Sequence, residues 1–285
     1  MEQRTPEWYK ARLGHITSSM VYVLMSVPRK KDETFTDTAK TYLYGLAAER
    51  QMSPVYLNDH FDEWLERTDT TTRAMRYGTE TEDLARQCYY LDLPDTQKVE
   101  ERGFVEHIKG EYGDSPDGIV VENGKAIKAI EIKCPNSATY MKYKAMFAEG
   151  KSLKEVEEKY YWQCQSHMLC NDVQQCDFVF FDKMLTNPLQ VVCVERNEDD
   201  IALMLERINL ASEFIKNITD NAPPAEPKRV TCGECKHFVR DTTGRSYNND
   251  THEYFTGVCN RGLTPDGCKK VFANKPRICS VYINL

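Results

Sequence analysis

Apolar and polar positions along the chain follow two periods, one typical of helices and one typical of strands. Helical spacing predicts helices near residues 6–13, 18–26, 37–50, 79–91, 137–148, 153–170 and 198–217. Apolar runs bounded by turn residues predict strands within 117–133 and near 176–182 and 189–195. Because helices and strands alternate in this way, we expect an α/β fold with a mixed central β-sheet flanked by helices.

The segment from Asp117 to Lys133 is predicted to be a β-hairpin that turns at Asn123-Gly124. The length of the turn decides where the side chains point, since a shift of one residue moves a strand's side chains to the other face. A plain two-residue loop would place Asp117 and Glu131 on opposite faces. A three-residue loop with Gly124 in the left-handed region adds a bulge and places both acids on one face. We predict the bulged three-residue turn.

Two short motifs in this hairpin carry candidate chemistry: Ser115-Pro116-Asp117-Gly118 and Glu131-Ile132-Lys133. Glu131 and Lys133 share one face of a strand. Carboxylate oxygens are the ligands that Mg²⁺ or Mn²⁺ prefer, and such ions activate water and stabilise a phosphate under attack. Lys133 would orient or deprotonate that water, or neutralise the transition state. Taken alone, the pattern is short and common, and the solvated face of an edge strand would be the preferred interpretation.

Three further blocks accompany the hairpin: Thr5 to Ser19, Met75 to Tyr89, and Tyr160 to Met168. In this order and spacing, the four blocks resemble the lambda-exonuclease type of viral recombinase nuclease, within the PD-(D/E)xK superfamily. The resemblance covers about residues 4 to 215. It implies a restriction-endonuclease-like core and a Mg²⁺-dependent exonuclease that degrades the 5′-ended strand of linear double-stranded DNA to mononucleotides. The 3′ single strand that remains would serve phage-type recombination.

The resemblance also implies a metal site and partners. Two Mg²⁺ or Mn²⁺ ions would be held by Glu82, Asp117, Glu131 and the backbone oxygen of Ile132. A homotrimer threaded by DNA ends and a single-strand annealing protein as partner are further implications. Glu82 has an alternative role, because Thr79 and Glu82 have the spacing of a capping box at a helix start.

Gln165 resembles the active-site glutamine that the family carries on a helix beside the metals, and Gln163 is the weaker candidate of the two. Arg12, Ser19 and Ser115 resemble the pocket for the terminal 5′-phosphate. Arginine offers a rigid fork of donors to phosphate, although a surface arginine and a serine N-cap explain Arg12 and Ser19 without the family. The family often has one more acid before Ser115, and the candidates are Glu106, Glu111 and Asp114. The hairpin insert is longer than in the phage prototype.

The composition of the chain indicates the class of protein and its expected location. The chain has 285 residues, 28% charged and 41% hydrophobic, which is ordinary for a globular protein with one sizeable domain and a small module. No apolar run approaches the ~20 residues that span a membrane, and the N-terminus lacks a secretory pattern. We therefore expect the cytoplasm of a bacterial or infected host cell. The net charge is −7, but residues 228–285 carry a net of +5, which leaves −12 for the rest.

Three regions are expected: a nuclease domain over 1–218, a proline-rich linker over 219–229 and a cysteine-rich, zinc-knuckle-like module over 230–285. Five of the eleven cysteines follow residue 231. Four of them form the predicted Zn²⁺ site: Cys232, Cys235, Cys259 and Cys279. Cys268 and His237 are spare candidates. Four thiolates also hold a [4Fe–4S] cluster, so an iron–sulfur cluster is the alternative, whereas disulfides are disfavoured in a reducing cytosol.

Two other functions remain open at this stage. One is an endonuclease or nickase of the same superfamily, which would not require a free DNA end. The other is a catalytically inactive DNA-binding scaffold protein whose functional part is the cysteine-rich module. Retention of Asp117, Glu131, Lys133 and Glu82 favours an active enzyme.

Overall fold

The computed structural model describes residues 2–30, 32–68 and 72–221, together with seven short strands between Arg229 and Ile278. Its contacts divide the chain into two units. The first unit combines Met1–Gln51 with Thr70–Thr219, and the second combines Met52–Asp69 with Asp220–Leu285. All the residues predicted for the nuclease site belong to the first unit.

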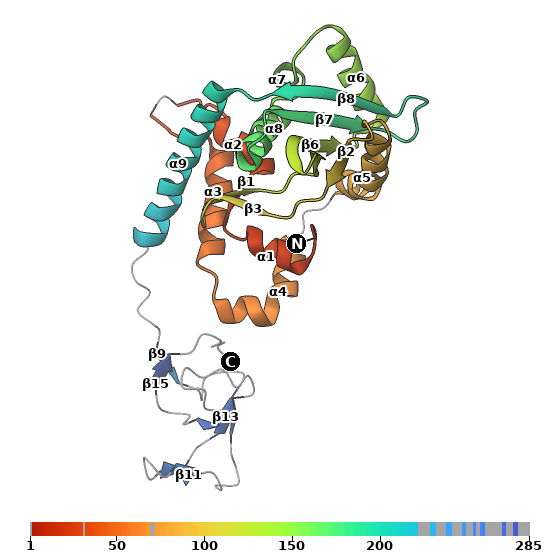
Figure 1. Cartoon of the computed structure of the whole chain (residues 1–285). Coiled ribbons are helices and arrows are strands. Elements are labelled where there is room, and N and C mark those ends of the chain that lie inside the picture. Colours follow the sequence, from red (N-terminus) through yellow and green to blue (C-terminus); the bar gives the residue numbers. More distant parts are fainter. Residues whose placement is uncertain are drawn as a thin grey trace. The chain divides into compact units, whose positions relative to one another are not determined.

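A five-stranded mixed sheet forms the centre of the first unit (Figure 1), with the strand order β2-β5-β6-β7-β8. The strands span Gln97–Glu100, Gly118–Glu122, Lys125–Lys133, Gln175–Phe181 and Leu189–Glu195. β6 and β7 are parallel, and the other neighbours are antiparallel. A parallel pair needs a long crossover connection. Here α6 (Ser137–Ala148), α7 (Leu153–Val156) and α8 (Glu158–Asn171) supply it.

A second, three-stranded sheet links the N-terminal segment to the segment that precedes Asp117. Its order is β1-β4-β3, and the strands span Ile16–Thr17, Tyr112–Asp114 and Val105–Ile108. β1 runs parallel to β4, with Thr17 opposite Gly113. Helix α1 (Pro6–Arg12) precedes β1, and Ser115 directly follows β4. These adjoining elements hold the ends of α1 and β4 close together.

Different helices cover the two faces of the central sheet. One hydrophobic core contains Ile119, Ala129, Phe178, Cys164 and Met168, the last two from α8. The other contains Val120, Ile130, Val179, Ala85 and Tyr89, the last two from α5 (Arg73–Leu91). Alternate residues of a strand point to opposite faces. Glu131 therefore shares the face of Ala129 and points toward α8.

Most of the secondary structure predicted from the sequence is confirmed. Helices α3 (Asp37–Arg50) and α6 and strand β8 have the expected bounds. The expected helix at 18–26 opens with a 3₁₀ turn, Ser18–Met20, before α2 (Val21–Met25). The expected helix at 153–170 is divided into α7 and α8, because Glu157 has extended backbone angles. Asn197 caps the last helix, α9 (Glu198–Asn221), by accepting a hydrogen bond from Asp200 N on its side chain.

The predicted three-residue turn of the hairpin is wrong. Glu122 pairs with Lys125, so the loop contains only Asn123 and Gly124, both at positive φ (50° and 76°). This is the geometry that Asn-Gly favours in two-residue hairpins. The bulge lies further along β6 instead, because Val121 pairs with Ala126 while Val120 pairs with Lys128.

The unpaired residue of this bulge is Ile127. It adds the one residue of offset that the turn itself does not supply. Gly118 consequently pairs with Ile130, and Asp117, which precedes β5, donates its backbone N–H to the carbonyl of Ile130 at 3.1 Å. The carboxyl groups of Asp117 and Glu131 lie close enough to interact, as predicted, although the bulge lies at Ile127 rather than in the turn.

Beyond α9, the described strands of the second unit pair as β10-β13-β14, β11-β12 and β15-β9. Their bounds are Arg229–Thr231 (β9), Phe238–Arg240, Tyr247–Asn248, Glu253–Tyr254, Gly257–Cys259, Lys270–Val271 and Pro276–Ile278 (β15). Helix α4 (Pro54–Thr68) also belongs to this unit. Among the described residues, no helix is long and apolar enough to cross a membrane.

The predicted zinc site lies largely outside the described residues. This applies to Cys232, Cys235 and Cys279, and to the spare candidates His237 and Cys268. Cys259 is described only as the last residue of strand β13. Helix α9 continues to Asn221, into the start of the expected linker, and residues 222–228 lie outside the described part.

Candidate active site

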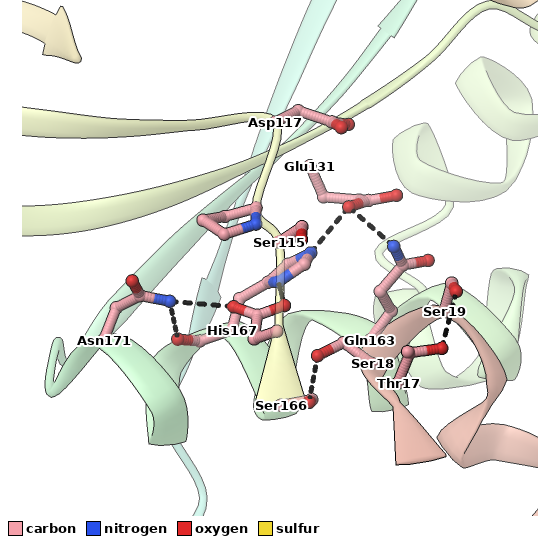
Figure 2. A network of polar contacts seen from close by, with 12 residues as sticks. Thr17, Ser18, Ser19, Ser115, Asp117, Glu131, Gln163, Ser166, His167 and Asn171 are labelled. Carbon is pink, nitrogen blue, oxygen red and sulfur yellow. Dashed lines mark hydrogen bonds and ion pairs between the residues drawn. The ribbon is translucent and has the colours of Figure 1, made fainter. Parts of the chain in front are cut away.

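The acids of the two predicted motifs meet at the end of the central sheet, where β5 begins and β6 ends (Figure 2). The backbone N–H of Asp117 donates to the carbonyl of Ile130 at 3.1 Å. Its carboxylate Oδ2 accepts a hydrogen bond of 2.7 Å from the backbone N–H of Ile132. Asp117 is thus tied to β6 through both its main chain and its side chain, beside Glu131.

Glu131 is completely buried and is held from two sides. Its Oε2 accepts hydrogen bonds from His167 Nε2 at 2.6 Å and from Gln163 Nε2 at 2.9 Å, both on α8. Its Oε1 pairs with the ammonium of Lys133. Burial raises the pKa of Glu131, but the charge of Lys133 and the contacts with His167 outweigh burial, so the pKa is lowered. Glu131 is a carboxylate.

Lys133 is a protonated, half-buried ammonium. Burial lowers its pKa, but the charges of Glu131 and Asp117 act in the opposite direction and raise the pKa above its ordinary value. Its Nζ also lies 5.2 Å from the centre of the Tyr160 ring. A lysine in this state donates hydrogen bonds and neutralises charge, and it does not accept a proton from water at neutral pH.

Asp117 has the reverse electrostatic environment. Burial raises the pKa of its carboxyl, the charges of Glu131 and Glu82 raise it further, and the pKa reaches about 7 despite the nearby Lys133. The charges of Glu131 and Glu82 therefore disfavour ionisation of Asp117 at this end of the sheet. Such a surplus of hard anionic oxygen fits a divalent cation, whose charge would relieve the repulsion.

Glu82 reaches the same region from α5 and is 7% exposed. Its carboxylate binds Arg4 Nη2 at 2.5 Å and Arg86 Nη2 at 3.0 Å. The alternative role in a capping box is wrong, because α5 begins at Arg73 behind the N-cap Thr72, which places Thr79 well inside the helix.

A cavity of about 1030 Å³ opens onto this region. Glu82, Ile132 and Lys133 line it, together with Arg4, Tyr77, Tyr143, Tyr160, Asp182 and Met184. Within the described part of the chain, no three His, Cys, Asp or Glu side chains form a ready cluster for a metal ion. Arg4 and Arg86 pair with Glu82, and Lys133 pairs with Glu131. The oxygen ligands fit Mg²⁺ or Mn²⁺ in kind, but cationic side chains now balance them.

The structure reverses the predicted ranking of the two glutamines. Gln163 contacts Glu131 directly. Gln165 is fully buried and turned elsewhere: its Nε2 donates to the carbonyl of Glu195 at 2.9 Å, and its Oε1 accepts from Asn197 N–H at 2.9 Å. The two side chains are separated because residues two apart on a helix point in different directions.

Two of the three predicted phosphate ligands are in contact. Ser115 Oγ accepts hydrogen bonds from Arg12 Nη1 at 3.2 Å and from Trp8 Nε1 at 2.9 Å. The Arg12 guanidinium also stacks 4.1 Å from the Trp8 ring centre. Burial lowers the pKa of Arg12, while Asp114 acts against that shift. Ser19 is exposed, lies in the 3₁₀ turn and contacts the hydroxyl of Thr17 at 3.3 Å.

Of the three candidates for an additional acid, only Asp114 lies behind the site. Glu106 is exposed and pairs with His15, and Glu111 lies at the turn before β4. Asp114 is fully buried and is connected to Glu131 through His167, whose Nδ1 lies 2.7 Å from Asp114 Oδ1.

His167 is a residue that the sequence interpretation missed. It is four residues after Gln163, so the two share one helical stripe toward Glu131. The four-residue spacing between Gln163 and His167 could have identified His167 from the sequence. It was overlooked because Gln165, rather than Gln163, was matched to the active-site glutamine of the family.

Comparison with known proteins gives consistent results. Residues 7–174, more than half of the chain, match the family model described as the YqaJ-like viral recombinase domain. An alkaline exonuclease (LHK-Exo) from Laribacter hongkongensis is 29% identical, with a TM-score of 0.58, covering 76% of this chain and 95% of that chain. The same values hold for the structure of LHK-Exo in complex with dAMP.

A phage-related exonuclease from Haemophilus somnus 129PT shares the fold. Its TM-score is 0.54 at 18% identity, and the match covers 73% of this chain and 96% of that chain. No curated protein sequence matches the chain. The family match and the structural similarities agree with the resemblance that the four sequence blocks indicated.

Proposed function

Since the chain belongs to the YqaJ-like viral recombinase domain family, we propose that it is a metal-dependent deoxyribonuclease that acts on the ends of linear double-stranded DNA. It would degrade the 5′-ended strand to mononucleotides and leave a 3′ single strand for recombination. The observation that supports the proposal is that the charges of Glu131, Glu82 and Lys133 all act on Asp117 at one end of the sheet, where Lys133 pairs with Glu131.

Glu82, Asp117, Glu131 and the carbonyl of Ile132 would hold two Mg²⁺ or Mn²⁺ ions, which supply activation of water and charge neutralisation at phosphorus when bound. Lys133 is already protonated, so its part is to donate to a phosphate oxygen or to orient the water. Tyr160 and Glu131 keep the ammonium in place. The raised pKa of Lys133 favours these roles over that of a general base.

Arg12 and Ser115 would bind the terminal 5′-phosphate and so set the direction of digestion. The stacking of Arg12 on Trp8 fixes the plane of the guanidinium, which suits a two-oxygen contact with phosphate. Ser19 would need to turn from Thr17 to join this pocket. The dAMP complex of LHK-Exo supports a nucleotide as product.

The test is digestion of linear duplex DNA with labelled ends in Mg²⁺. Ends with a 5′-phosphate should be digested faster than 5′-hydroxyl ends, and Arg12→Gln should remove that preference. Asp117→Ala and Lys133→Ala should abolish digestion, while Lys125→Ala, at the exposed start of the same strand, should not. Digestion of a covalently closed circle would instead identify an endonuclease. Wild-type rates in both Asp117→Ala and Lys133→Ala would refute the site.

Assembly and the C-terminal region form separate parts of the proposal. A homotrimer and a single-strand annealing partner follow from the family resemblance, and light scattering tests the first. For the region 230–285 we propose a Zn²⁺ site on Cys232, Cys235, Cys259 and Cys279. Elemental analysis of the purified chain should find one zinc per chain, and a brown protein with stoichiometric iron would replace zinc by an iron–sulfur cluster.

A further inference from the structure

His167 lies between two buried carboxylates, and nothing in the chemistry proposed above uses it. The side chains of His167, Asp114 and Glu131 are all 0% exposed. Nδ1 of the ring lies 2.7 Å from Asp114 Oδ1, and Nε2 lies 2.6 Å from Glu131 Oε2. Both ring nitrogens thus face carboxylate oxygens, and the histidine bridges β4 and β6 (Figure 2).

The far end of this bridge is firmly anchored. Asn171, one turn after His167 on α8, donates from Nδ2 to Asp114 Oδ2 at 2.8 Å and to the carbonyl of His167 at 2.9 Å. The partners of Asp114 therefore fix both of its oxygens. The imidazole is consequently locked by its own helix on one side and by β4 on the other.

The near end of the bridge determines the orientation of Glu131. His167 and Gln163 both bind Oε2, and this leaves Oε1 with Lys133, which lines the cavity. A carboxylate held in this way can turn only one oxygen toward a ligand. Burying three ionisable groups is costly, and such triads are often replaced by apolar residues without loss of stability. The position of His167 and Asp114 directly behind Glu131 therefore indicates a role in the site.

We propose that His167 is the positioning residue of the metal site: anchored by Asp114, it holds Glu131 so that one carboxylate oxygen is presented to a divalent cation. The inference rests on the proposed function, because Glu131 is a metal ligand only in that function. Partners that orient metal ligands typically change metal affinity or activity by 10- to 100-fold when they are removed. Asp114, left open among three acids by the sequence, becomes the anchor of His167.

The experiment measures Mn²⁺ binding to the full chain by electron paramagnetic resonance of the free ion. His167→Gln is compared with wild type and with His107→Gln, an exposed histidine of β3. We expect His167→Gln to bind Mn²⁺ about 10- to 100-fold more weakly, and Asp114→Asn to lie between it and wild type. His107→Gln should match wild type. In steady-state digestion, kcat of His167→Gln should recover at high Mn²⁺ while KM for DNA stays near wild type.

A second measurement avoids substitutions that unfold the chain. In wild-type protein with ¹⁵N-labelled histidine, added Mg²⁺ should shift the ring signals of His167 and leave those of His107 unchanged. Wild-type Mn²⁺ affinity in a folded His167→Gln, or unmoved His167 signals while Mg²⁺ binds, would overturn the positioning role alone. Failure of wild type to bind either ion would overturn the proposed function and this inference with it.

Discussion

Arg4 and Glu82, which are far apart in the sequence, form a close ion pair, with 2.5 Å between Nη2 and Oε2. Arg4 has a positive φ of 66°, a conformation that is uncommon for residues other than glycine. The contact closes one side of the cavity and places a guanidinium beside an acid that the proposed metal site requires. The positive charge of Arg4 thereby partly neutralises Glu82, as a bound cation would.

Arg4→Gln should therefore strengthen Mg²⁺ binding in the absence of DNA. The Arg4 side chain is 41% exposed, and pairs of this kind contribute ~0.2–1 kcal/mol. Removing the competitor should thus lower the Mg²⁺ dissociation constant by up to about fivefold. Isothermal titration calorimetry measures it, with Lys125→Gln as a control that keeps the wild-type value. Weaker binding in Arg4→Gln would mean that Arg4 assists the metals rather than competing with them.

Asp117 should make the metal-free protein less stable as the pH rises. Its pKa is about 7 in the folded chain and near 4 in an unfolded one. Between these values the folded state binds more protons, so the free energy of unfolding falls with increasing pH. Asp117→Asn should remove this slope and raise the melting temperature at pH 8. Mg²⁺ should stabilise wild type there and leave Asp117→Asn nearly unchanged.

The same proton should compete with metal. Mg²⁺ affinity and digestion rate should both increase as the pH rises through about 7, because Asp117 must lose its proton to bind the ion. Lys133 should add no loss of activity up to pH 9, since its pKa is raised. A pH–rate profile at saturating DNA measures both effects. A rate that falls between pH 6 and 8 would contradict the assignment.

Alanine substitutions of Gln163 and Gln165 should affect different quantities, kcat in the first case and the melting temperature in the second. Gln163→Ala removes a contact to Glu131 and should lower kcat about tenfold with little change in melting temperature. Gln165→Ala removes two hydrogen bonds to the backbone of Glu195 and Asn197, at a cost of about 0.5–1.5 kcal/mol each, and should mainly lower the melting temperature. The reverse result would restore the ranking expected from the family resemblance.

Because β6 contains a bulge, deleting Ile127 and deleting Ala129 should affect activity differently. Deleting Ile127 removes the unpaired residue and leaves Gly118 opposite Ile130, so activity should persist at reduced stability. Deleting Ala129, which lies between the bulge and the site, moves Glu131 to the other face and should abolish activity. Circular dichroism checks that each variant is folded. Full activity without Ala129 would show that the register does not position the acids.

The sequence predicted several of the longer elements and missed helix α4 and the short strands held by tertiary contacts. Helix α3 and strand β8 have the expected bounds, whereas α4 was missed although its apolar residues gather on one face. Strands β1 and β4 have two and three residues, too short for a period to be visible, and they form because they pair with each other.

For the site, the acids and lysine could be named from local motifs, but their environment could not. Whether Gln163 or Gln165 reaches Glu131 depends on the rotation of α8 about its axis, which packing fixes. The raised pKa of Asp117 arises from residues on three separate elements. The bulge lies at Ile127 rather than at Gly124 because of how β6 pairs within the whole sheet.

The parallel pairing of β6 with β7 has a consequence for synthesis of the chain. All three acids and Lys133 emerge from the ribosome before α8, because the crossover helices lie between the two parallel strands. A nascent chain that has reached residue 150 thus contains the reactive groups but neither Gln163 nor His167. The candidate site is completed only when the crossover folds back over its own sheet.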